Sequence, residues 1–87
     1  MNNVILVGTI IDLEEVHEDY LTARIKVYRL NTKKYDLIPI EFHSAMATIA
    51  YEALYEGCHI VLKGVLQTHD NQLVVIATNI IRMDHYE

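Results

Sequence analysis

Short runs of β-branched and other apolar residues recur along this chain of 87 residues, and only one stretch changes to the period of a helix. The first run, Val4 to Val16, is continuously apolar at its start, contains Gly8 and then becomes acidic. Such a run predicts a buried strand with a bulge or sharp bend at the glycine. The polar residues 17–19 then predict a turn, so the chain is expected to reverse its direction after the first strand.

Two further strands are expected before the helical stretch. Residues 20–30 alternate between apolar and polar or aromatic side chains, which is the pattern of a strand with one buried face. After a loop at residues 31–34, a third strand is expected from Tyr35 to Phe42. Residues 44–56 predict a helix with Ser44 as its N-cap and Gly57 as the left-handed residue after its end. The apolar stripe of this helix comprises Met46, Ile49, Ala50, Ala53 and Leu54.

Two more strands complete the pattern, at residues 59–68, with Gly64 inside it, and at residues 72–83. A tight turn at residues 69–71 joins them, and residues 84–87 are expected to form a frayed end. This order predicts one mostly β domain over residues 1–87. Its expected fold is the oligonucleotide-binding fold, a five-stranded Greek-key barrel with the helix between strands three and four. Another small α+β sandwich with the same element order is the alternative.

The charges of the chain are segregated. The net charge is −5, which argues against a phosphate-bearing partner. However, residues 20–35 hold five basic side chains and no acid, so this stretch carries +5 and the remainder −10. A binding site depends on its local field, and the distribution therefore matters more than the total.

Tyrosines interleave with the basic stretch. Binding of single-stranded nucleic acid without sequence preference requires aromatic rings on which bases stack and positive charge along the backbone. By strand parity Arg24, Lys26 and Tyr28 share one face, whereas Arg29 points to the other side. The alternative is a solvated face whose tyrosines only cover the barrel. The candidate nucleic-acid-binding residues are Tyr20, Arg24, Lys26, Tyr28, Lys33, Lys34, Tyr35, Phe42 and Lys63.

The positions of two of these candidates are explained equally well by a structural role without a ligand. Phe42 shares its strand parity with Ile38 and Ile40, so its ring either meets a base or packs in the core. Lys63 alternates with valines, which places it on the outer face of its strand. There it serves either as a phosphate contact or as a surface lysine.

Several segments resemble bacterial single-stranded DNA-binding proteins. Met1 to Gly8 matches the opening of that family, a Met-Asn-polar triplet followed by an apolar strand and a glycine. Residues 36–42, 49–57 and 60–68 resemble its third strand, its helix with the glycine turn, and its fourth strand. The chain is also similar to primosomal replication protein N, a dimeric relative. The resemblance implies an oligonucleotide-binding fold and binding of single-stranded DNA in replication, recombination or repair. It also implies a stacking role for Phe42, assembly into homodimers or homotetramers, and replication proteins as partners.

The chain departs from the family pattern in informative places. Leu37 stands where the family often has Trp or Phe, His43 and Ser44 replace a glycine and a basic residue, and the loop at 69–71 is short. The acidic, partner-recruiting tail of the family has no counterpart. These departures leave open an alternative function, a protein-interaction subunit that has lost nucleic-acid binding. They also leave open whether RNA is bound.

Other classes of function find no support in the sequence. It contains no phosphate-binding glycine loop, nucleophile elbow or catalytic triad pattern, so neither an enzyme nor a cofactor is expected. The five histidines and one cysteine lack metal-ligand spacing and are expected to be scattered. No apolar run is long enough to cross a membrane. With a single cysteine and no signal-peptide pattern, a reducing cytoplasmic location is expected.

Residues 4–11 are apolar on both faces, which favours pairing with a second copy.

Overall fold

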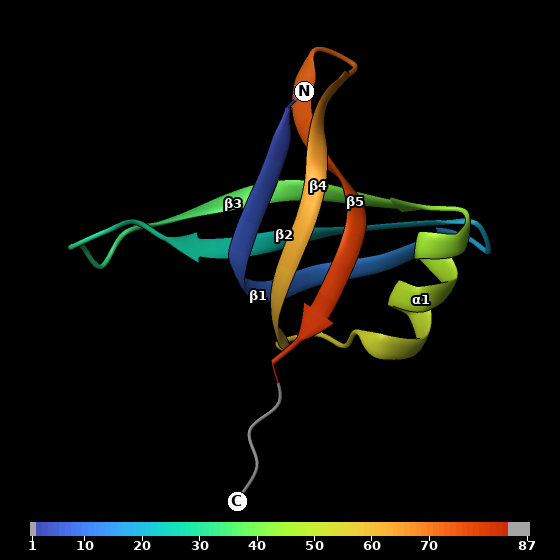
Figure 1. The fold of residues 1–87 in the computed structure, drawn as a ribbon, viewed down its shortest axis with the longest axis horizontal. Helices are drawn as coiled ribbons and strands as arrows, with labels where there is room; N and C mark the ends of the chain where they lie inside the picture. The colour runs from blue at the N-terminus through green and yellow to red at the C-terminus, as the bar shows by residue number, and fades with distance from the viewer. Residues whose placement is uncertain (1, 84–87) are drawn as a thin grey trace, which may run out of the picture.

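Five strands and one helix follow one another in the predicted order. The computed structural model describes residues 2–83, and its strands close into a barrel in the order β1-β2-β3-β5-β4 (Figure 1). The predicted oligonucleotide-binding fold is confirmed, and the predicted ends of all five strands are correct to within two residues. The expected frayed end at 84–87 lies outside the described residues. The elements are β1 (Asn3–His17), β2 (Tyr20–Tyr28), β3 (Tyr35–His43), α1 (Ala45–Ala53), β4 (His59–His69) and β5 (Gln72–Arg82).

The long strand β1 belongs to both halves of the barrel. Its first half pairs with β4 and its second half pairs with β2, and Thr9 is opposite residues of both strands. Gly8 lies where β1 passes between them, and a Cβ added there would collide with the backbone carbonyl of Lys26. The glycine therefore permits a close approach between strands. The bulge expected at this glycine lies further along, between Ile11 and Glu14.

Two hairpins project from the barrel in different directions. In Figure 1 the β2–β3 hairpin extends to the left, away from α1, and the β4–β5 hairpin rises at the top. Asp70 and Asn71 form the tip of the β4–β5 hairpin with φ values of 53° and 64°, as a two-residue turn with positive φ at both positions requires. The parallel contact of β3 with β5, at Ile40↔Val75 and Glu41↔Ile76, closes the barrel. That contact brings the start of β5 beside the C-terminal half of β3.

The helix packs on the barrel through its small residues. Ala47 and Ala50 are fully buried, whereas Ile49 is 47% exposed, so the predicted stripe was wrong at this position. An alanine face lets a short helix approach the barrel closely, and the bulkier Ile49 is rotated towards solvent. Ser44 is the N-cap, with a φ of 55°, but its side chain makes no capping hydrogen bond; its carbonyl accepts from Ala47 N. Gly57 has the predicted positive φ, but α1 ends at Ala53, three residues earlier than predicted, so Gly57 does not directly follow the helix.

Candidate nucleic-acid interface

The outer face of β2 and β3 holds most of the residues predicted to bind nucleic acid. The two strands pair in an antiparallel register along their whole length, from Tyr20↔His43 to Tyr28↔Tyr35. The predicted alternation of β2 is confirmed, because its apolar residues Leu21, Ala23 and Ile25 are buried. The outward side chains of β2 are Tyr20, Thr22, Arg24, Lys26 and Tyr28.

One end of this face combines exposed aromatic rings with lysines; we call Lys26, Tyr28, Lys33, Lys34 and Tyr35 the lysine–tyrosine end. Tyr28 is 60% exposed and Tyr35 46%, and their rings meet edge to face with centroids 5.7 Å apart. The ammonium of Lys26 lies 4.3 Å from the ring centroid of Tyr35 and 5.4 Å from that of Tyr28. Each of these distances is within the range of a cation–π contact. The end therefore presents positive charge directly beside two rings.

The two arginines of the basic stretch are neutralised by acids from elsewhere. Arg24 donates through Nε and Nη2 to Asp12 of β1, and Arg29 donates to Asp36, with Nη2 2.8 Å from Oδ1. The hydrogen bond from Arg29 holds the pKa of Asp36 below its ordinary value. The sequence showed a stretch of five unopposed cations, but pairing across strands cancels two of them. Within residues 2–83 the three lysines of the lysine–tyrosine end form no ion pair.

The other end of the face is organised around a buried carboxylate; we call Tyr20, Glu41, His43 and His69 the histidine–carboxylate end. Only 9% of the Glu41 side chain is exposed, and its two oxygens accept from His43 Nε2 and His69 Nδ1, both at 2.8 Å. The ring of Tyr20 stacks on His43 with centroids 4.8 Å apart. Tyr20 is thus engaged within the protein, and eight residues along β2 separate it from Tyr28, about 26 Å in an extended strand.

These contacts shift the pKa values of the cluster. Burial raises the pKa of Glu41, but the hydrogen bonds from His69 and His43 outweigh burial, so the value lies below its ordinary one. The hydrogen bond to Glu41 raises the pKa of His69. Burial and the nearby charge of Glu41 raise the pKa of Tyr20. The cluster therefore holds an ionised Glu41 that favours a protonated His69.

Phe42 and Lys63 lie apart from the other candidates. Phe42 is fully buried in the core, so the core alternative is correct and its ring has no face open to a base. Lys63 does point outward, as predicted, but it belongs to β4 and pairs with Ile5 of β1 and Asn79 of β5. It is therefore on a separate face of the barrel.

That separate face is rich in exposed apolar residues. Val7 lies opposite Val61, and Val61 lies opposite Ile81, so an apolar row crosses β1, β4 and β5. Ile5, Val7 and Ile81 are 67%, 52% and 59% exposed. A hollow of about 280 Å³ lies between Ile5, Lys63 and Ile81. An exposed apolar row of this kind is typical of an interaction surface.

Sequence reasoning missed several residues of the β2–β3 face and of the strands beside it. Asp12 belongs to an acidic run, and nothing in that run identifies the one acid that meets Arg24. Glu41, His43 and His69 are far apart in the chain or adjacent to core residues, and the histidines had been expected to be scattered. Parity in β3 places Glu41 on the outer face with His43, and this was the one available signal. In the part of the chain that the structure describes, no three His, Cys, Asp or Glu residues are arranged to hold a metal ion.

Comparison with solved structures identifies the fold. The chain superimposes on the dimeric N-terminal domain of PriB from Thermoanaerobacter tencongensis with a TM-score of 0.77 and 25% identity, covering 97% of this chain and 98% of that one. It has the oligonucleotide-binding fold of single-stranded DNA-binding proteins. A small single-stranded DNA-binding protein from Mycoplasma pneumoniae matches with a TM-score of 0.77 and 20% identity, over 100% and 99% of the two chains. The mitochondrial single-stranded DNA-binding protein of S. cerevisiae matches with a TM-score of 0.79 and 16% identity, over 98% and 96%.

These matches confirm the predicted resemblance at the level of the fold. No protein-family model matches the chain, and no curated protein matches its sequence. The likeness therefore rests on the barrel, which the chain covers almost completely in each of these neighbours. As to membranes, no helix among residues 2–83 is long and apolar enough to span one.

Proposed function

We propose that the chain binds single-stranded DNA through the lysine–tyrosine end, by base stacking and backbone contacts that tolerate any sequence. The observation that supports this most directly is Lys26 beside the exposed rings of Tyr28 and Tyr35. A base stacked on an aromatic ring contributes about 1–3 kcal/mol, and a lysine next to it neutralises the adjoining phosphate. Lys33 and Lys34, in the loop that follows, extend the positive surface.

Fluorescence anisotropy tests this proposal. A labelled oligo-dT of about 30 nucleotides, longer than the roughly 4–16 nucleotides that one such barrel covers, is titrated with the protein at several salt concentrations. We expect saturable binding whose logarithm falls with the logarithm of salt by about 0.7 per phosphate contacted. Absence of binding at low salt would contradict the proposal. The function would then be that of a protein-interaction subunit.

We also propose that the β1–β4–β5 face pairs two copies of the chain. Burial of Ile5, Val7 and Ile81 would remove their exposed apolar surface from water. Such burial stabilises an interface by about 25 cal/mol per Å² of apolar surface. The PriB domain with the same fold is dimeric, which supports assembly through a face of this barrel. A dimer would carry two lysine–tyrosine ends. We further propose a role in DNA replication, recombination or repair, with other replication proteins as partners.

A charge placed in the apolar row tests the pairing. Val7→Glu would introduce a carboxylate that cannot be buried without cost, and light scattering is expected to show a monomer where the unmodified protein is a dimer. Glu15→Gln, a change elsewhere on β1, is expected to leave the dimer intact. A Val7→Glu protein that remained fully dimeric would place the contact on another face.

A further inference from the structure

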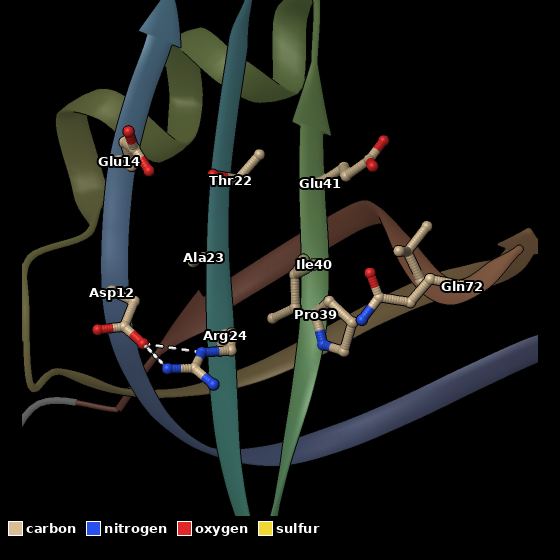
Figure 2. A pocket seen from close by; sticks show the side chains of 10 residues that line it. Asp12, Glu14, Thr22, Ala23, Arg24, Pro39, Ile40, Glu41 and Gln72 are labelled. Atoms are coloured by element: carbon tan, nitrogen blue, oxygen red, sulfur yellow. Dashed lines mark hydrogen bonds and ion pairs between the residues drawn. The ribbon is translucent and has the colours of Figure 1, made fainter. Parts of the chain in front are cut away.

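A hollow of about 350 Å³ lies on the outer face of β1, β2 and β3, where the first residues of β5 approach β3. In Figure 2 the Arg24–Asp12 pair lies on its β1–β2 side and Gln72 reaches towards Pro39 from β5. The volume is at the small end of the range of about 300–1,000 Å³ for ligand pockets. It suits one ring-sized group.

The hollow is continuous with the lysine–tyrosine end. Arg24 and Lys26 are two residues apart on the outer face of β2, and their partners on β3 are Pro39 and Leu37. This separation is about 7 Å in an extended strand. A nucleic-acid strand that stacked on Tyr35 and continued along β3 towards Glu41 would pass the mouth of the hollow.

The walls of the hollow disfavour a phosphate and favour a base edge. Arg24 forms a neutral pair with Asp12, Glu41 is paired with His69, and the carboxylate of Glu14 adds negative charge. Both oxygens of Glu41 already accept from histidines, so Glu14 and the second oxygen of Asp12 are the carboxylate acceptors left for a ligand, beside the Thr22 hydroxyl and the Gln72 amide. Carboxylates accept hydrogen bonds and cannot donate them, whereas the guanidinium of Arg24 only donates.

We propose that this hollow is a nucleobase subsite that takes one unstacked base and prefers guanine to thymine. Guanine offers a carbonyl oxygen and a ring nitrogen as acceptors for Arg24, together with ring and exocyclic N–H donors for Asp12 or Glu14. Thymine offers a single N–H flanked by two carbonyl oxygens, which the carboxylates repel. The inference rests on the proposed binding of single-stranded DNA and adds a base preference to it.

Anisotropy with matched oligonucleotides tests the subsite. The probes are labelled oligo-dT and the same oligomer with regularly spaced, isolated thymines replaced by guanine, or by hypoxanthine, which lacks the 2-amino group of guanine. The guanine-containing oligomer is expected to bind about fivefold more tightly than oligo-dT, with hypoxanthine in between. Equal or weaker binding of the guanine oligomer, with salt-dependent binding of all three, would overturn the subsite and leave the proposed function standing. Failure of every oligomer to bind would overturn the proposed function itself.

Two variants with the same change of charge localise the effect. Glu14 lines the hollow and lies opposite Thr22, whereas Glu15 lies opposite Leu21 and does not line it. Glu14→Gln is expected to reduce the preference for guanine. Glu15→Gln is expected to strengthen binding of all probes equally and to leave the preference unchanged. An equal loss of preference in both variants would mean that the hollow does not read the base.

Discussion

The two ends of the β2–β3 face use similar residue types in opposite ways. At the lysine–tyrosine end, Lys26 forms no ion pair within residues 2–83 and lies beside tyrosine rings that are about half exposed. At the histidine–carboxylate end, Glu41 satisfies both histidines and the ring of Tyr20 is stacked on His43. Groups whose hydrogen-bonding or stacking capacity is used up within the protein have little to offer a ligand. The comparison therefore predicts that an aromatic ring beside a charge serves as a binding platform only where both are left open.

Removal of the two open rings is expected to have the largest effect. The Tyr28→Ala/Tyr35→Ala variant loses stacking worth about 1–3 kcal/mol per base, so binding of oligo-dT should weaken at least tenfold. The control is Tyr51→Ala/Tyr55→Ala, in α1 and in the segment just after it, whose rings are 64% and 54% exposed but lie away from the interface. Anisotropy measures both. If the Tyr51→Ala/Tyr55→Ala variant lost as much affinity, exposure alone would explain binding and the comparison between the two ends would fail.

The lysines are expected to determine the salt dependence. Lys26→Ala should reduce the slope of log affinity against log salt by about 0.7 if it neutralises one phosphate. Arg24→Ala should change the slope less, because Asp12 already neutralises the guanidinium. Titrations at several salt concentrations measure the two slopes. A larger change in the Arg24→Ala protein would mean that Arg24 leaves Asp12 for the DNA backbone.

Tyr20 is expected to matter less than Tyr28. Because its ring is already stacked on His43, Tyr20→Ala should weaken oligo-dT binding by less than about threefold, below the value of one full stack. The same anisotropy assay measures this effect. A loss as large as that from Tyr28→Ala would show that DNA reaches both ends of the face, as the sequence had suggested.

The histidine–carboxylate end is expected to affect stability rather than binding. The raised pKa of His69 stabilises the fold fully below its unfolded value of 6.5, and the benefit is lost as the pH rises through the folded value. The lowered pKa of Glu41 stabilises the fold above 4.5, and the benefit is lost as the pH falls through the folded value. The ion pair between His69 and Glu41 should therefore stabilise the fold most between the unfolded pKa values of 4.5 and 6.5.

Thermal unfolding of His69→Gln measures this contribution. Its Tm is expected to fall below that of the unmodified protein near about pH 5.5 and to approach it above about pH 8. In a Glu41→Gln background, His69→Gln should lose this pH dependence. A deficit in Tm that stays constant from acid to alkaline pH would show that the contact is not ionic.

The sequence predicted the barrel well because its strands follow a period of two and its one helix interrupts them. It also placed Arg24, Lys26 and Tyr28 on one face, since parity along a single strand needs no tertiary information. It did not show that Asp12 neutralises Arg24, because that pairing depends on the bulge in β1 that sets the register with β2. For the same reason the contact of His69 with Glu41 could not be predicted, as it requires the β4–β5 hairpin to lie beside β3.

The most direct test of the account is the mapping of amide chemical shifts in the protein as an oligo-dT is added at low salt. We expect the largest changes at Lys26, Tyr28 and Tyr35 and in the loop at residues 31–34. Changes at Tyr20 and His43 should be smaller. Changes confined to the histidine–carboxylate end, or to the β1–β4–β5 face, would contradict the central claim that DNA binds at the lysine–tyrosine end.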